Sequence, residues 1–380
     1  MTTPLVGVIG ASGAVGSEVT RLLARSRQVR LRIGCRRVDR LRAFAADTPH
    51  AAIDVAAVDV DDPDSLAAFC RGCRIVVNCA GPSFRILDVV ARAAFEAGAE
   101  YVDPGGDRPV HERLSRTPPP QDRIAILTAG LMPGLSGLLP RWLARRGFDR
   151  VRQLTAYVGG RGRLTEGTAG DYVLSLQHGD SEALAAWRQG ARVSRALEPL
   201  VDVELPFFPG RVMAQPFLSA ETETLARDLG LTDVTWYNVF QGGHMLAALR
   251  RLRPVRSPHD LASAVADLTQ AADLDLFGEE SYQRLVVTLD GEAAGGPVRR
   301  TATLHARDAQ ALTGTIATLA TLAIVEGSIT PGVWFAADVL PTTVVDRLGD
   351  MPAVAAFHVL DDTVIADATA QSAALDEGVL

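Results

Sequence analysis

The stretch Leu5-Val-Gly-Val-Ile9-Gly10-Ala-Ser-Gly13-Ala-Val-Gly16 decides the fold class of this chain. Its first five residues predict a short buried strand, and a helical pattern with apolar Val19, Leu22 and Leu23 follows the glycines. Glycines at this junction permit a tight turn and let the amides at the start of a helix approach an anion. The spacing is G-x-x-G-x-x-G, and its position between a strand and a helix predicts a dinucleotide-binding loop.

Strand and helix patterns continue to alternate up to about residue 130. Apolar segments end near Ile33, Asp59, Asn78, Val102 and Ala129, and a polar or glycine-rich loop follows each of them. Repeated units of this kind build a doubly wound parallel sheet of the Rossmann type, an α/β fold in which ligands bind at the carboxyl ends of the strands.

The choice of cofactor depends on the residues just after the second predicted strand. NAD-binding sites usually place an acid there, whereas this chain has Arg36 and Arg37, and a guanidinium suits the 2′-phosphate of NADP(H). Two solvated arginines are the alternative. Asp59, at the end of the third strand, is expected near the adenine. We therefore assign the cofactor site to these residues and to the loops after the first and fourth strands: Gly10, Ser12, Gly13, Ala14, Val15, Gly16, Arg36, Arg37, Asp59, Asn78, Ala80, Gly81 and Pro82.

Composition excludes several classes of function. All 38 basic residues are arginine, so neither Schiff-base chemistry nor a lysine general acid or base is available. The formal net charge of -7 predicts no basic surface for nucleic acid. One C-x-x-C pair, Cys70 and Cys73, lacks a second pair or nearby histidines, so we expect reduced thiols and no metal site.

No segment predicts contact with a membrane. The longest uncharged run, Ala309–Val325, contains four threonines and is too short to span a bilayer, so we expect a buried helix there. The first residues lack the basic stretch of a signal peptide. These features predict a cytoplasmic protein.

The middle of the chain is less regular. Strand-like stretches at Val151–Val158, Thr235–Phe240 and Arg284–Leu289 alternate with helical patterns, which predicts a second, α+β domain for substrate binding and dimerisation. The expected division is 1–135 for the dinucleotide-binding domain, 136–320 for the substrate domain and 321–380 for a segment that returns to the nucleotide domain.

Three stretches resemble the saccharopine dehydrogenase-like family of NADP-binding oxidoreductases: Gly10–Gly16, Asn78–Pro82 through Gly98–Asp103, and Ala129–Gly134. Glu326–Gly332 is similar to the segment that returns to the nucleotide domain in that family. Members reduce imines or oxidise amines, others are trans-acting enoyl reductases, and some thiazolinyl imine reductases of siderophore biosynthesis look similar. Because the chain has no lysine and no clear clamp for an amino-acid carboxylate, secondary metabolism is favoured over primary lysine metabolism.

The resemblance implies NADPH-dependent reduction of a C=N bond, with a thiazolinyl imine or a related intermediate as the most specific substrate. That substrate is a small molecule, either free or tethered to a carrier protein. The alternatives are a saccharopine or amine dehydrogenase, a trans-acting enoyl reductase, and a non-catalytic NADP-binding sensor with a lost active site. By analogy with the fold type, we expect a homodimer.

Reduction of an imine also needs an acid that protonates the nitrogen. Tyr172 is the first candidate and His178 the second, because both lie in an apparent helix after a glycine-rich loop that, in the resembled family, enters the substrate cleft. His244, beyond a strand end, and Asp107, beyond another, are further candidates. The alternatives are that Tyr172 packs on an aliphatic face, that His178 is solvated, that His244 has a core or capping role and that Asp107 caps the next helix.

Overall fold

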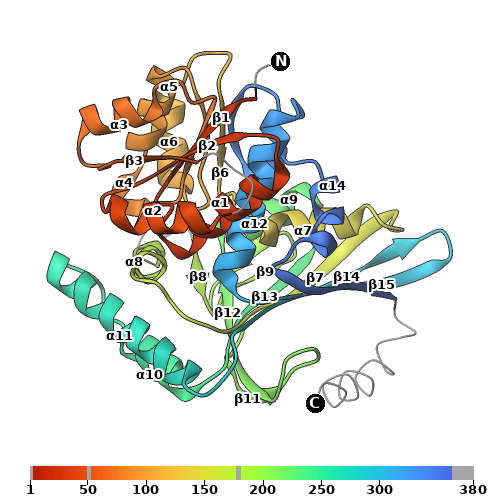
Figure 1. The fold of residues 1–380 in the computed structure, drawn as a ribbon. Coiled ribbons are helices and arrows are strands. Elements are labelled where there is room, and N and C mark those ends of the chain that lie inside the picture. Colours follow the sequence, from red (N-terminus) through yellow and green to blue (C-terminus); the bar gives the residue numbers. More distant parts are fainter. Residues whose placement is uncertain (1–2, 49–52, 177–180, 362–380) are drawn as a thin grey trace. The chain divides into compact units, whose positions relative to one another are not determined.

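The computed structural model describes residues 3–48, 53–176 and 181–361. The chain forms two compact units. Unit 1 comprises Met1–Leu138 and Gln310–Val344, and unit 2 comprises Leu139–Ala309 and Val345–Leu380. Figure 1 shows the elements of both units along the chain.

Unit 1 is built on a seven-stranded sheet in the order β16-β6-β5-β4-β1-β2-β3, and all the neighbouring strands are parallel. This order contains the Rossmann series 3-2-1-4-5-6, so the fold class predicted from the sequence is confirmed. The strands are β1 (Leu5–Ile9), β2 (Arg30–Cys35), β3 (Ile53–Ala57), β4 (Ile75–Asn78), β5 (Glu100–Val102), β6 (Ile124–Leu127) and β16 (Gly332–Phe335). The strand β16 confirms that the chain returns to this sheet after Glu326.

Helices cover both faces of this sheet (Figure 1). Those of unit 1 are α1 (Ala14–Ser26), α2 (Val38–Asp47), α3 (Pro63–Cys70), α4 (Ser83–Ile86), α5 (Val89–Glu96), α6 (Arg108–Arg116), α12 (Ala309–Val325) and α13 (Ala336–Val339). The residues of α7 (Leu135–Ala144) and α14 (Thr343–Asp346) are divided between the two units. Leu87, with a φ of 53°, separates α4 from α5.

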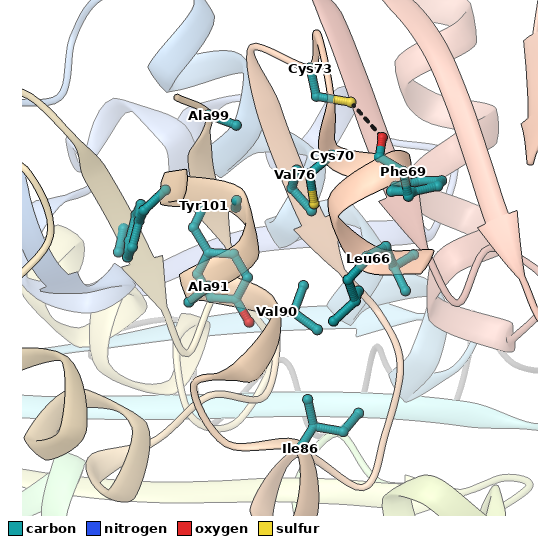
Figure 2. Packing of buried hydrophobic residues seen from close by; sticks show 14 of the residues in the cluster. Leu66, Phe69, Cys70, Cys73, Val76, Ile86, Val90, Ala91, Ala99 and Tyr101 are labelled. Atoms are coloured by element: carbon teal, nitrogen blue, oxygen red, sulfur yellow. Dashed lines mark hydrogen bonds between the residues drawn. The ribbon is translucent and has the colours of Figure 1, made fainter. Parts of the chain in front are cut away.

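The main core of unit 1 lies between the sheet and helices α3, α5 and α6. Figure 2 shows Leu66 and Phe69 of α3 and Val90 of α5 packed together with Val76 and other buried residues. Each fully buried side chain of this size contributes about 1.5–3 kcal/mol through removal of apolar surface from water.

Helix α12 is buried on almost every side, as its uncharged sequence predicts. Its threonine hydroxyls donate to carbonyls one turn earlier, for example Thr318 Oγ1 to Gly314 O at 2.8 Å, so the buried hydroxyls are satisfied. A Cβ on Gly314 would lie 2.8 Å from Cβ of Glu18, which shows how closely α12 packs against α1.

Unit 2 contains a mixed ten-stranded sheet with the main order β10-β9-β13-β7-β14-β15-β17, as expected for the second domain. The strands are β7 (Arg150–Arg161), β8 (Glu182–Ala183), β9 (Ala186–Arg188), β10 (Ala191–Val193), β11 (Leu200–Glu204), β12 (Arg211–Leu218), β13 (Asp233–Phe240), β14 (Tyr282–Ala293), β15 (Gly296–Ala306) and β17 (Val354–Asp361). Its helices are α8 (Glu166–Ser175), α9 (Ala220–Asp228), α10 (Gly243–Arg251) and α11 (Pro258–Leu276), with a short 3-10 helix at Leu348–Asp350.

The observed division differs from the expected boundaries in three places, of which the first is small: residues 136–138 belong to unit 1. Residues 310–320 belong to unit 1 rather than to the substrate domain, because α12 packs against α1. Residues 345–361 belong to unit 2 rather than to the nucleotide domain, because β17 pairs antiparallel with β15.

Candidate functional site

The glycine loop between β1 and α1 forms a close-packed turn. Gly10 has a φ of 77°, and its N–H donates to Gly34 O at 2.9 Å. A Cβ on Gly10 would lie 2.6 Å from the carbonyl carbon of Cys79, and a Cβ on Gly16 would lie 2.4 Å from Gly10 O. Only glycine therefore fits at these two positions, which is the close backbone approach that a dinucleotide loop requires.

The amino terminus of α1 is left open toward an anion. Gly13 occupies its N-cap position and provides no side-chain cap, whereas Asp62 caps α3 and Ser257 caps α11 through their side chains. Ser12, Gly13 and Ala14 are exposed. The uncapped amides and the positive end of the helix dipole suit a pyrophosphate, so the residues present fit a dinucleotide cofactor.

Arg36 and Arg37 are exposed directly after β2. Within the described part of the chain, neither guanidinium has a protein partner. The nearest following acid in the sequence, Asp39, pairs instead with Arg42 at 3.2 Å. An unopposed pair of guanidinium groups in this position suits a phosphate rather than a ribose hydroxyl.

Asp59 lies after β3 and is half-buried. Its Oδ1 accepts the N–H of Asp61 at 3.1 Å, and its own N–H donates to Ser65 Oγ at 3.0 Å. These bonds shape the turn before α3; the proposed contact of Asp59 with adenine stays a prediction.

The loop after β4 approaches the glycine loop, since Gly10 packs against the Cys79–Ala80 peptide. Asn78 is 1% exposed, and its Oδ1 accepts the N–H of Ala80 at 3.2 Å. Its Nδ2 donates to Tyr101 Oη at 3.1 Å and to Asp103 Oδ2 at 3.2 Å. Both ends of the Asn78 amide therefore bind protein atoms. The predicted cofactor residues Ala80, Gly81 and Pro82 come directly after it in the loop.

Asp103 belongs to the same buried polar group as Asn78 and Tyr101, and it is 2% exposed. Burial raises the pKa of Asp103, while the donors Tyr101, Gly106, Gly105 and Asn78 act in the opposite direction and favour the carboxylate. Burial, followed by the nearby Asp103 charge, raises the pKa of Tyr101 well above its usual value, so this hydroxyl stays protonated and donates. Because both of its oxygens are bound and enclosed, Asp103 does not present a carboxylate to a substrate, a role that its position at the strand end would also have allowed.

Asp107 lies at the N-cap position of α6, and its Oδ1 accepts the N–H of Arg108 at 2.7 Å. The capping interpretation of this residue is thus observed. Its proposed part in catalysis stays a prediction.

Tyr172 lies on α8 within a cluster of apolar residues from α8, α10 and α11. It packs against the buried residues of this cluster, which include Val173, Leu268 and Ala271, and burial raises the pKa of its hydroxyl to about 12. His244 is exposed near the start of α10, where its N–H donates to Asp275 Oδ1 at 3.1 Å. Tyr172 and His244 therefore lie on α8 and α10, two helices that contribute to the same apolar cluster. His178 falls outside the described residues.

Unit 2 also has polar atoms that the sequence did not single out. Among the described residues, Asn238 Oδ1, Gln241 Oε1 and Tyr282 Oη are buried without a hydrogen-bond partner. All three lie near the end of β7, because Asn238 is in register with Val158, Gln241 N donates to Gly160 O, and Tyr282 is in register with Arg161. Buried polar groups that lack partners are candidates for contact with a bound polar molecule.

Two kinds of feature are absent from the described residues. No group of three or more His, Cys, Asp and Glu side chains there could hold a metal ion. No helix in that part of the chain is long and apolar enough to cross a membrane.

Comparison with known proteins agrees with this geometry. Residues 6–121 match the family model of the saccharopine dehydrogenase NADP binding domain. A probable mitochondrial saccharopine dehydrogenase-like oxidoreductase from Arabidopsis thaliana is 31% identical over 120 residues. That alignment covers 28% of this chain and 26% of the Arabidopsis protein.

The whole chain also has a counterpart among solved structures. Apo saccharopine dehydrogenase (L-Glu forming) from Saccharomyces cerevisiae aligns over 94% of this chain and 99% of its own, with a TM-score of 0.66. The sequence identity is 16%, so this match shows a common fold. The sequence resemblance and the prediction of NADP(H) are confirmed: residues 6–121 are similar to the saccharopine dehydrogenase NADP binding domain, and the cofactor of this domain is NADP(H).

Proposed function

We propose that the protein is an NADPH-dependent oxidoreductase that reduces a C=N bond. The observation that carries the proposal is the open amino terminus of α1 beside unopposed Arg36 and Arg37, in a domain of an NADP-binding family. The shared fold with a yeast protein named saccharopine dehydrogenase supports chemistry at a carbon–nitrogen bond. Cells hold the NADP pool mainly reduced, which favours reduction over oxidation of an amine.

The bound cofactor supplies a hydride to the carbon of the imine, and the protein must supply a proton to its nitrogen. The chain has no lysine, so the candidates are Tyr172, His178, His244 and Asp107. Tyr172 remains the first choice because α8 follows the glycine-containing end of β7; burial raises the pKa of its hydroxyl to about 12, which makes this hydroxyl a weaker acid than that of an exposed tyrosine. We propose a thiazolinyl imine or a related cyclic imine, free or tethered to a carrier protein, as the substrate.

The test is the loss of NADPH absorbance with purified protein and a panel of cyclic imines, thiazolines, an enoyl thioester and saccharopine-type amines, the amines with NADP⁺. Turnover of imines or thiazolines alone supports the proposal. Turnover of the enoyl thioester alone would make the protein an enoyl reductase, and NADP⁺-dependent oxidation of the amine alone would make it an amine dehydrogenase. Tight NADPH binding without turnover of free or carrier-tethered compounds would point to a sensor.

The proton donor is tested by Tyr172→Phe. We expect kcat to fall about a hundredfold, as is typical for loss of a general acid, with the Kd for NADPH unchanged. Tyr237→Phe is the matched control, because burial raises the pKa of that tyrosine as well and it lies in a different apolar cluster of unit 2. An equal kcat for Tyr172→Phe and wild type would remove Tyr172 from the reaction.

We also propose that the protein is a homodimer. In the described part of unit 2, β17 is the last strand on its side of the sheet, and Val359 on this strand is 40% exposed. An open strand edge of this kind readily pairs with another chain. Light scattering of the purified protein tests this proposal, and a monomer mass would reject it.

A further inference from the structure

The carboxylate of Asp103 lies at the point where three strand-end loops of unit 1 meet. Its Oδ1 accepts the N–H groups of Gly105 and Gly106, both at 2.8 Å. Its Oδ2 accepts Tyr101 Oη at 2.6 Å and Asn78 Nδ2 at 3.2 Å. Four donors thus surround one buried group, which leaves no part of the carboxylate for a ligand.

The direction of these hydrogen bonds determines how the Asn78 side chain is oriented. A carboxylate only accepts hydrogen bonds, so the amide of Asn78 must turn its NH₂ group toward Asp103. The oxygen of the same amide then points to the opposite side, where it accepts the N–H of Ala80 at 3.2 Å. Asp103 therefore sets, through Asn78, the position of the first peptides after β4.

Backbone bonds connect the same region to the end of β6. Ala129 N donates to Asp103 O at 2.9 Å, and Thr128 N donates to Gly106 O at 3.1 Å. The loop after β4 also contacts the glycine loop, because a Cβ on Gly10 would lie 2.7 Å from Ala80 N. A change in the Asn78 amide would consequently be transmitted to the backbone of the glycine loop, which we assign to the cofactor site.

We propose that Asp103 is a positioning residue for NADP(H), which acts through Asn78 to hold the loop Cys79–Pro82 in its binding conformation. The proposal rests on the cofactor assignment and not on the choice of substrate. Asn78 contributes through this loop, since both ends of its amide already bind protein atoms. Tyr101 completes the group by donating to the same oxygen of Asp103.

The substitution Asp103→Asn tests the direction of the hydrogen bonds with almost no change in shape. Its oxygen can still accept from the two glycine amides, but its NH₂ group then faces the NH₂ group of Asn78. If the Asn78 amide keeps its orientation, two NH₂ groups face each other without an acceptor. If it rotates by 180°, its NH₂ group faces the N–H of Ala80 instead. We expect the Kd for NADPH to rise about tenfold, which is the scale of one unsatisfied buried hydrogen bond.

Exchanging the two residues restores the pattern. In the double variant Asn78→Asp with Asp103→Asn, the new amide donates to the new carboxylate, and that carboxylate accepts the N–H of Ala80. We expect this variant to bind NADPH within about threefold of wild type, although each single variant binds weakly. A role of Asp103 that depended on charge at its own position would not be rescued in this way.

Two controls separate positioning from general damage. Glu100→Gln removes another buried carboxylate, at the opposite end of the same strand β5, where it accepts the N–H of Ile124 and pairs with Arg123 at 3.4 Å. This variant should lose stability and keep its affinity for NADPH. Adenosine 2′,5′-bisphosphate, which carries only the adenine half of the cofactor, should bind Asp103→Asn and wild type equally.

Fluorescence titration measures all of these affinities, and urea denaturation measures stability. Equal NADPH affinity of Asp103→Asn and wild type would overturn the proposal, and so would a folded double variant without rescue. If Asp103→Asn does not fold, the double variant decides alone. Failure of wild type to bind NADPH would instead reject the cofactor assignment, and failure to reduce any imine would leave these binding measurements intact.

Discussion

Substitution of Gly16 by alanine tests the packing of the cofactor loop most directly. The added Cβ would lie 2.4 Å from Gly10 O and 2.8 Å from Ala11 Cα, whereas ordinary contacts begin at 3.4 Å. The atoms that it meets belong to the backbone, so no side chain can rotate away. The loop and α1 must therefore separate by about 1 Å at this point.

This displacement has two measurable effects. Overpacking of a buried position typically costs 1–3 kcal/mol, so we expect the free energy of unfolding to fall by about 2 kcal/mol. The amides of Ala14 and Val15 move with the helix, and a displacement of about 1 Å at a binding site weakens function by roughly ten- to a hundredfold. We expect the Kd for NADPH to rise by a factor in this range.

Urea denaturation followed by circular dichroism gives the first quantity, and fluorescence titration with NADPH gives the second. Gly98→Ala is the control, because Gly98 has a φ of 74° and its added Cβ meets no atom within 4 Å. Alanine in this left-handed conformation should lower the free energy of unfolding by about 1 kcal/mol, and the affinity for NADPH should not change. If Gly16→Ala keeps both the stability and the affinity of wild type, the reasoning from close packing is refuted.

Three other predictions concern charge and protonation. Arg36→Ala should weaken NADPH binding and leave NADH binding nearly unchanged in titrations. The control Arg30→Ala, at the other end of β2, should alter the affinity for neither cofactor. An equal loss of affinity for both cofactors in Arg36→Ala would reject the phosphate contact. Asp107→Ala should lower the free energy of unfolding by about 1 kcal/mol, and Asp107→Ser should lower it by less, because serine also caps helices. An equal decrease for both variants in urea denaturation would argue against the cap. Burial raises the pKa of Cys70 from 9.0 to about 12 and that of Tyr282 from 10.0 to about 12, so both stay neutral in the folded protein while the unfolded chain loses their protons. Stability should therefore decline as the pH rises from 9 toward 12, and Cys70→Ala should flatten part of that decline; an unchanged slope would show that this thiol titrates alike in both states.

Local patterns in the sequence were sufficient to predict the dinucleotide-binding domain. The strand, the glycine loop and the helix of the first unit are neighbours along the chain, so spacing alone identifies them. Arg36 and Arg37 were proposed as the phosphate contact for the same reason, since they directly follow a strand. Tyr101 and Asp103 carried a weaker signal, because alternate residues of a strand share a face and the second of them lies just beyond the strand end.

Unit 2 was predicted only in outline. Its sheet joins strands that are far apart in the sequence, such as β15 with β17, and pairing of this kind leaves no mark in local periodicity. The positions of Tyr172 among apolar side chains and of His244 on the surface depend on how α8, α10 and α11 pack. That Asn238 Oδ1 and Tyr282 Oη are buried without a hydrogen-bond partner likewise depends on which strands lie next to each other in the sheet.

The sequence by itself determined the fold class, the cofactor loop and the preference for NADP(H), because each depends on residues that are adjacent along the chain. Only the tertiary structure decided that Asp103 is enclosed by four donors rather than open to a substrate. The physical reason is that burial and the direction of a hydrogen bond are properties of the surroundings. Those surroundings bring together the ends of three strands that the sequence separates by at least twenty residues.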